Sequence, residues 1–178
     1  MKLYYARMKP ALAAATTALL FLCSGAALHA EEETLYYTLT AIEDVSYGEA
    51  VVAGDYETAI EGILTLAKVA RGGFEAQTNL CVAYTRSGDF EKADDSCDAA
   101  LAALKRQSRN ATAPGLAPFY SRRLHEKYLA LALSNRGVLR VISGEPDLAR
   151  EDFEKAANLK FGLDVADANL AKLGTEES

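Results

Sequence analysis

Few side chains in this sequence could carry out catalysis, and their spacing does not assemble a reactive site. After residue 30 the chain has a single histidine, His125, among charged residues at the polar start of an expected helix. No serine, cysteine or carboxylate stands at a spacing that would build a nucleophilic triad with it. The sequence also has no glycine-rich phosphate loop. We therefore expect a surface histidine and a protein that is not an enzyme.

The acidic residues Asp94, Asp95 and Asp98 resemble a calcium-binding loop only superficially. They fall in the middle of an expected helix, where a run of charge is typical of a solvated face. Histidines and cysteines do not cluster at metal-ligand spacing either. The sequence predicts no metal site and no cofactor.

The first 30 residues have the layout of a secretory signal peptide. A basic start precedes an uncharged apolar run over residues 11–22, small residues follow, and residues 31–33 are all acidic. The apolar run is too short to span a bilayer of about 30 Å comfortably. We predict cleavage after Ala30 and export to the bacterial periplasm or beyond. An uncleaved anchor is the first alternative; a lipoprotein attached through Cys23 is the second, disfavoured by Leu22 before it.

The 148 residues that follow fit one domain with an acidic surface. They hold all 25 Asp and Glu but only 16 of the 19 Lys and Arg, a net charge of −9. Such a charge argues against general affinity for nucleic acid or for anionic membranes. Half of the whole chain is hydrophobic, which is enough to fill a core.

A six-residue phrase recurs at a fixed interval. GDYETA begins at Gly54 and GDFEKA begins at Gly88, 34 residues later. A third phrase, GEPDLA, begins at Gly144, one period plus 22 residues further on. In each copy a glycine is followed five residues later by alanine: Ala59, Ala93 and Ala149. Internal periodicity of this length is typical of stacked helical repeats.

These motifs resemble the tetratricopeptide repeat (TPR) family, whose unit is a 34-residue helix–turn–helix. The closest match is SNRGVLRVISGEPDLAREDFEKAANL, over residues 134–159. The resemblance implies an all-α solenoid of about three repeats. Glycine suits the turn because it accepts a positive φ, Asp55 and Asp89 then cap the second helices, and the alanines allow close helix packing.

We expect a non-helical stretch at 35–42, a capping box from Ser46 to Glu49, and a long helix from residue 119 onward. Further helices are expected at 47–53, 55–69, 74–87 and 89–106. The resulting division is a signal peptide (1–30), an N-terminal extension (31–45) and a TPR domain (46–178) with repeats at 40–73, 74–107 and 130–163, an insertion at 108–129 and a capping helix at 164–173.

Cys81 and Cys97 are the two cysteines that remain after cleavage. An exported protein with an even number of cysteines invites a disulfide. Counting from the turn at Gly88 places Cys97 about 6 Å along the helix axis from the point opposite Cys81. With an interhelical gap of roughly 8 Å, this separation exceeds the usual Cα limit near 7 Å. The argument favours two buried thiols, with the disulfide as the alternative.

Asn79, Asn135 and Asn169 occupy the same position in successive first helices. In peptide-binding members of the family that the chain resembles, an asparagine here bonds the main chain of a bound peptide, so these three are candidate partner contacts in a concave groove. An amide suits that task because it both donates and accepts. The alternative is that each asparagine only bonds neighbouring helices within the stack.

Arg136 and Asp152 face each other across the hairpin that turns at Gly144, and we predict a structural ion pair between them. Basic residues concentrate around the insertion, from Lys105 to Arg140, with Glu126 as the single acidic residue there. This basic patch consists of Lys105, Arg106, Arg109, Arg122, Arg123 and Lys127. It either docks an acidic segment of a partner or is neutralised by neighbouring acidic helices.

The expected function is a non-catalytic scaffold that binds a protein or peptide of the cell envelope. The runner-up is a structural subunit packed permanently in an oligomer or envelope assembly, without recognition of free peptides. No nucleic acid and, after cleavage, no membrane insertion are expected. The residues name no partner, and a fold alone does not identify one.

Overall fold

The structure is a computed structural model that describes residues 3–7, 37–45, 47–69, 73–110, 118–160 and 162–176. These residues are mostly helical and form seven helices and one two-stranded sheet. In chain order the elements are β1 (Leu3–Arg7), β2 (Thr38–Ile42), α1 (Gly48–Ala53), α2 (Tyr56–Val69), α3 (Phe74–Ser87), α4 (Phe90–Asn110), α5 (Pro118–Ile142), α6 (Pro146–Ala157) and α7 (Asp164–Glu176). The all-α class is confirmed.

The recurring glycine has the same conformation in all three copies. Gly54, Gly88 and Gly144 have φ of 85°, 83° and 80°, in the left-handed region. The N–H of the next residue donates to the carbonyl five residues back, from Asp55 to Ala50 and from Asp89 to Tyr84. Glu145 makes the equivalent bond to Arg140 at 2.8 Å. Each glycine therefore ends one helix in the same way and directs the chain into the next.

The second helices of the hairpins begin as expected. Asp55 Oδ1 accepts from the N–H of Thr58, and Asp89 Oδ1 accepts from the N–H of Lys92, at 3.3 and 3.4 Å. Pro146 occupies the first turn of α6, where a missing N–H costs nothing. Ser46, the expected cap of α1, lies outside the described residues.

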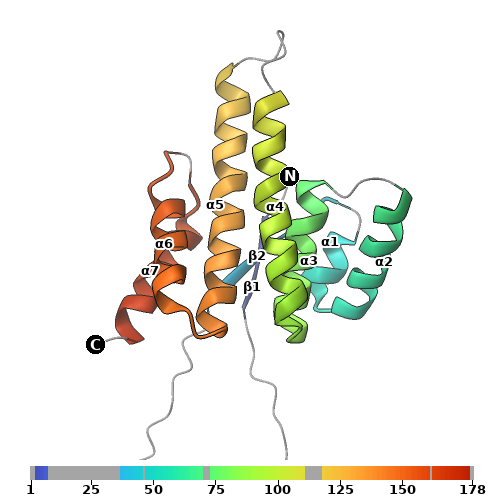
Figure 1. The fold of residues 1–178 in the computed structure, drawn as a ribbon, viewed down its shortest axis with the longest axis horizontal. Helices are drawn as coiled ribbons and strands as arrows, with labels where there is room; N and C mark the ends of the chain where they lie inside the picture. Colours follow the sequence, from blue (N-terminus) through green and yellow to red (C-terminus); the bar gives the residue numbers. More distant parts are fainter. Residues whose placement is uncertain are drawn as a thin grey trace, which may run out of the picture.

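The helices pack in chain order in a row, and the strands lie behind the middle of that row (Figure 1). Figure 1 shows α4 and α5 side by side at the centre, α1–α3 on one side and α6 and α7 on the other. β2 crosses behind this row and contacts α1, α3 and α5. None of the helices within the described ranges is long and apolar enough to cross a membrane.

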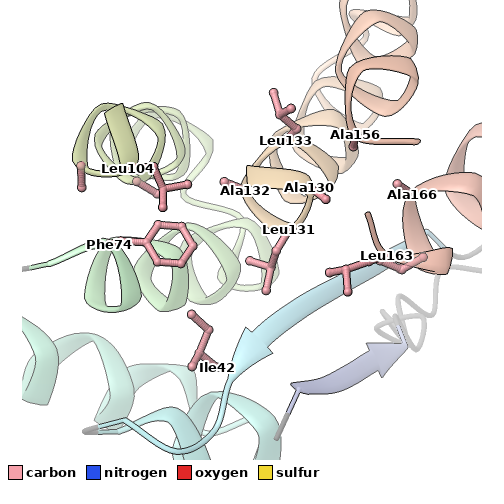
Figure 2. Packing of buried hydrophobic residues seen from close by; sticks show 13 residues of the cluster. Ile42, Phe74, Leu104, Ala130, Leu131, Ala132, Leu133, Ala156, Leu163 and Ala166 are labelled. Atoms are coloured by element: carbon pink, nitrogen blue, oxygen red, sulfur yellow. The ribbon is translucent and has the colours of Figure 1, made fainter. Parts of the chain in front are cut away.

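The core extends from helix to helix and includes the strand. Ala59, Ala93 and Ala149 are fully buried, as expected where paired helices come closest. Ile42 at the end of β2 belongs to a cluster with residues from five of the helices, α3 to α7 (Figure 2), among them Phe74, Leu131 and Ala166. A second cluster joins Tyr37, Leu39 and Ala41 to residues of α1–α3 and α5–α7.

The expected helix at 74–87 has those bounds in the structure. α2 and α4 each begin one residue later than predicted, and α4 continues to Asn110. The non-helical stretch at 35–42 includes β2, as its β-forming residues indicated. Of the predicted signal peptide only residues 3–7 are described, and they form β1, which pairs antiparallel with β2.

Candidate functional site

Three buried asparagines hold the main chain of β2. Asn169 Oδ1 accepts from the N–H of Thr38, and its Nδ2 donates to the Thr38 carbonyl, both at 2.9 Å. Asn135 makes the same pair of bonds with Thr40, both at 2.8 Å. All three asparagines are fully buried.

Asn79 repeats this arrangement at the other end of the strand. The N–H of Ile42 donates to Asn79 Oδ1 at 2.8 Å, and Asn79 Nδ2 donates to the Ile42 carbonyl at 2.9 Å. We call this set of six bonds the asparagine ladder. Its rungs come from α7, α5 and α3 as the strand runs forward, so β2 crosses the helices in the reverse of their chain order.

The asparagine ladder matches the geometry of an extended chain. In a strand, the N–H and C=O of one residue point to the same edge, and alternate residues share that edge at a repeat of about 6.8 Å. A carboxamide offers one acceptor and a donor group on the same plane, so it satisfies both main-chain groups of one residue. The ladder therefore recognises extended backbone without reading side chains.

Side chains of the strand add packing to this main-chain recognition. Leu39, Ala41 and Ile42 are fully buried, and the Tyr37 ring stacks on Phe153 with centroids 6.2 Å apart. Both faces of β2 thus contact the core. The extended segment that the three asparagines bond belongs to this chain.

The three asparagines lie on α3, α5 and α7, in a row along β2. Their main-chain bonds join helices to a strand, although Asn169 Nδ2 also donates to Ser134 Oγ at 3.2 Å. Bonding between helices alone, the alternative from the sequence, therefore does not describe the ladder. Sequence reasoning missed Thr38, Thr40 and Ile42; the β-forming character of 35–42 was the signal that could have indicated them.

Arg136 and Asp152 form the predicted ion pair. Arg136 Nε and Nη2 donate to the two Asp152 carboxylate oxygens at 2.8 and 2.9 Å. Arg140 Nη1 also donates to Asp152, and Arg136 Nη1 donates to Asp98, each at 2.6 Å. Asp152 is fully buried, and its hydrogen bond raises the pKa of the Arg136 guanidinium above the ordinary value. These ion pairs join α5 to α6 through Asp152 and α5 to α4 through Asp98.

Cys81 and Cys97 form a disulfide, so the preference for buried thiols was wrong. Their Cα atoms are 4.9 Å apart. The gap of roughly 8 Å separates helix axes, and each Cα lies about 2.3 Å from its own axis, so Cα atoms that face each other are much closer than the axes. The equivalent pair in the third hairpin is Gly137 and Phe153. A Cβ on Gly137 would lie 2.5 Å from the Phe153 ring, which shows the same close approach.

Removing the disulfide should destabilise the protein by about 3 kcal/mol, since it closes a loop of 16 residues. Urea denaturation with and without reductant measures this, and a Cys81→Ala/Cys97→Ala variant, insensitive to reductant, is the control. Thiol labelling of the denatured, unreduced chain after leader removal should find no free thiol. Two labelled thiols would contradict the assignment.

The basic residues of the insertion lie at one end of the α4–α5 pair. Lys105 and Arg106 are exposed near the end of α4, and Arg122 and Arg123 are exposed near the start of α5. Figure 1 shows these ends rising together beyond the other helices. Lys127 is half-buried, and the side chain of Arg109 lies outside the described ones. Arg122 Nε donates to Glu126 at 2.8 Å, so part of this charge is neutralised internally.

His125 and the three aspartates of the acidic run lie on α5 and α4. His125 is half-buried on α5, and Asp94, Asp95 and Asp98 are exposed on α4. Within the part of the chain that the structure describes, histidines, cysteines and carboxylates form no group that could hold a metal ion.

Comparisons with protein-family models, with curated proteins and with solved structures found no match for this chain. The asparagine ladder is thus interpreted from its own geometry.

Proposed function

We propose that this chain is a TPR-type helical scaffold, without catalytic activity, that mediates protein–protein interaction in the bacterial periplasm or cell envelope. The observation that carries the proposal is the asparagine ladder. The first helices of the hairpins that turn at Gly88 and Gly144, and α7 after them, each place one amide against extended main chain. Such an arrangement binds polypeptide irrespective of sequence, which is the property a scaffold requires.

β2 belongs to the same chain and occupies the asparagine ladder. A partner protein would therefore bind another surface. A segment covalently attached near its site has a high effective concentration, so a free peptide competes poorly with it. The exposed basic end of α4 and α5 is the surface of this scaffold that suits an acidic partner segment.

Reversing charge at Arg122 and Arg123 tests this surface. An Arg122→Glu/Arg123→Glu variant should lose capture of the acidic partner, at least tenfold at low ionic strength; because the variant also loses the Arg122–Glu126 pair, urea denaturation must confirm that it is folded under the conditions of capture. Site-specific photo-cross-linking from Lys105 in the native envelope measures capture. An Arg150→Glu variant is the control, because Arg150 lies on α6, away from this end. Undiminished capture by the double variant would contradict the assignment.

The structural-subunit alternative has a separate readout. The mass of the purified chain in solution distinguishes the two functions. A monomer that cross-links to one defined partner supports the scaffold. An obligate homo-oligomer, with no cross-link to any other protein, would overturn the proposal.

A further inference from the structure

β2 has two edges, and only one of them faces the asparagine ladder. The N–H and C=O groups of Thr38, Thr40 and Ile42 point to the asparagines. Because alternate residues of a strand point to opposite edges, Leu39 and Ala41 direct their main-chain groups the other way. We call this the outer edge of β2.

The outer edge is occupied by β1. The two strands are antiparallel, with Ala6 opposite Leu39 and Tyr4 opposite Ala41. Figure 2 draws β1 on the side of β2 away from Leu131. A single extended segment therefore fits this edge without disturbing the ladder.

The occupant belongs to the segment that the sequence predicts to be removed. Cleavage after Ala30 would separate residues 3–7 from the domain and leave the Leu39 and Ala41 groups without their strand partners. An unpaired edge is a template for another extended chain. We propose that in the processed protein the outer edge of β2 is a docking site for an antiparallel strand of a partner protein.

Charge and side-chain character define the partner. The seated segment is LYYAR, aromatic and β-forming, with Lys2 before it and Arg7 at its end. The turn that follows β2 carries Glu43 and Asp44, and the processed chain has a net charge of −9. A basic, aromatic segment is complementary to this body. A second copy of the chain, being equally acidic, is repelled.

A peptide with the sequence of residues 1–7 is the direct probe. The chain is exported, purified after processing, and its N-terminus is established by mass spectrometry. Fluorescence anisotropy of the labelled peptide should then show saturable binding. The full 178-residue chain, which keeps β1, should bind the same peptide at least tenfold more weakly because its own strand competes.

N-methylated peptides identify the edge. The N–H of Ala6 points to Leu39, whereas the N–H of Tyr5 points away from β2. Methylation at Ala6 should therefore weaken binding at least tenfold, and methylation at Tyr5 should change it less than twofold. The peptide pair leaves the protein unaltered, so a folding defect cannot produce the difference.

Four results would overturn the inference: no binding of the unmodified peptide, equal effects of the two methylations, residues 3–7 retained in the exported protein, or a homodimer that the peptide dissociates. Hydrogen exchange distinguishes peptide binding at the outer edge of β2 from peptide binding at the asparagine ladder. If the peptide instead displaced β2 from the asparagine ladder, the amides of Thr38, Thr40 and Ile42 would lose protection. If the peptide does not bind the outer edge, the proposed capture of a partner by the basic end of α4 and α5 is still tested separately by the Arg122→Glu/Arg123→Glu variant.

Discussion

Replacing Asn135 with alanine is expected to lower the free energy of unfolding by about 2 to 6 kcal/mol. The substitution leaves both the N–H and the C=O of Thr40 without a partner in a fully buried strand. Each buried group that loses its bond costs about 1–3 kcal/mol. Urea denaturation gives the loss of stability, and amide exchange at Thr40 reports release of the strand.

Two variants control for the substitution itself. Asn158→Ala removes an exposed asparagine at the end of α6 and should change stability by less than about 0.5 kcal/mol. Thr40→Val removes a buried hydroxyl that has no hydrogen-bond partner among the described residues, so it should cost little or stabilise. If Asn135→Ala matched Asn158→Ala, the ladder would contribute nothing to stability.

Replacing Asp152 with alanine is expected to cost about 3–5 kcal/mol, the range for breaking a buried ion pair from one side. Asp152 is fully buried and accepts from both Arg136 and Arg140, whose side chains are 17% and 19% exposed. Without Asp152, the guanidinium groups of Arg136 and Arg140 lose their buried carboxylate partner. Thermal and urea denaturation both measure the effect.

Asp98 offers the matched control, because it binds the same guanidinium from the outside. Its side chain is 60% exposed, and exposed ion pairs contribute about 0–1 kcal/mol. Asp98→Ala should therefore be nearly neutral. A triple replacement of Asp152, Arg136 and Arg140 by leucine and methionines should recover most of the loss. Equal costs for Asp98→Ala and Asp152→Ala would contradict the role of burial.

The sequence was sufficient for those features that depend on local rules. Glycine at Gly54, Gly88 and Gly144 indicated helix ends because the left-handed conformation is costly for other residues. Asp55 and Asp89 indicated helix starts through their capping bonds. The Arg136–Asp152 pair followed from its place opposite the turn. Each of these inferences involves residues within one hairpin.

The features that the sequence did not predict involve distances between elements. The disulfide depends on the distance between two Cα atoms that face each other across α3 and α4, which is much shorter than the spacing of the helix axes. The ladder joins Asn169 to Thr38, 131 residues away in the chain. Nothing in the spacing of the asparagines indicates whether their ligand belongs to this chain or to another.

That separation in the chain also orders the folding of the protein. Hairpins α3–α4 and α5–α6 involve local contacts, which form fast, whereas strand docking closes loops of 37, 95 and 131 residues. During synthesis β2 emerges before the helices, and α7, which bears Asn169, emerges after α3 and α5. The Asn169 bonds to Thr38 can therefore form only after α7 has been synthesised, and a chain interrupted before α7 holds β2 by Asn79 and Asn135 alone.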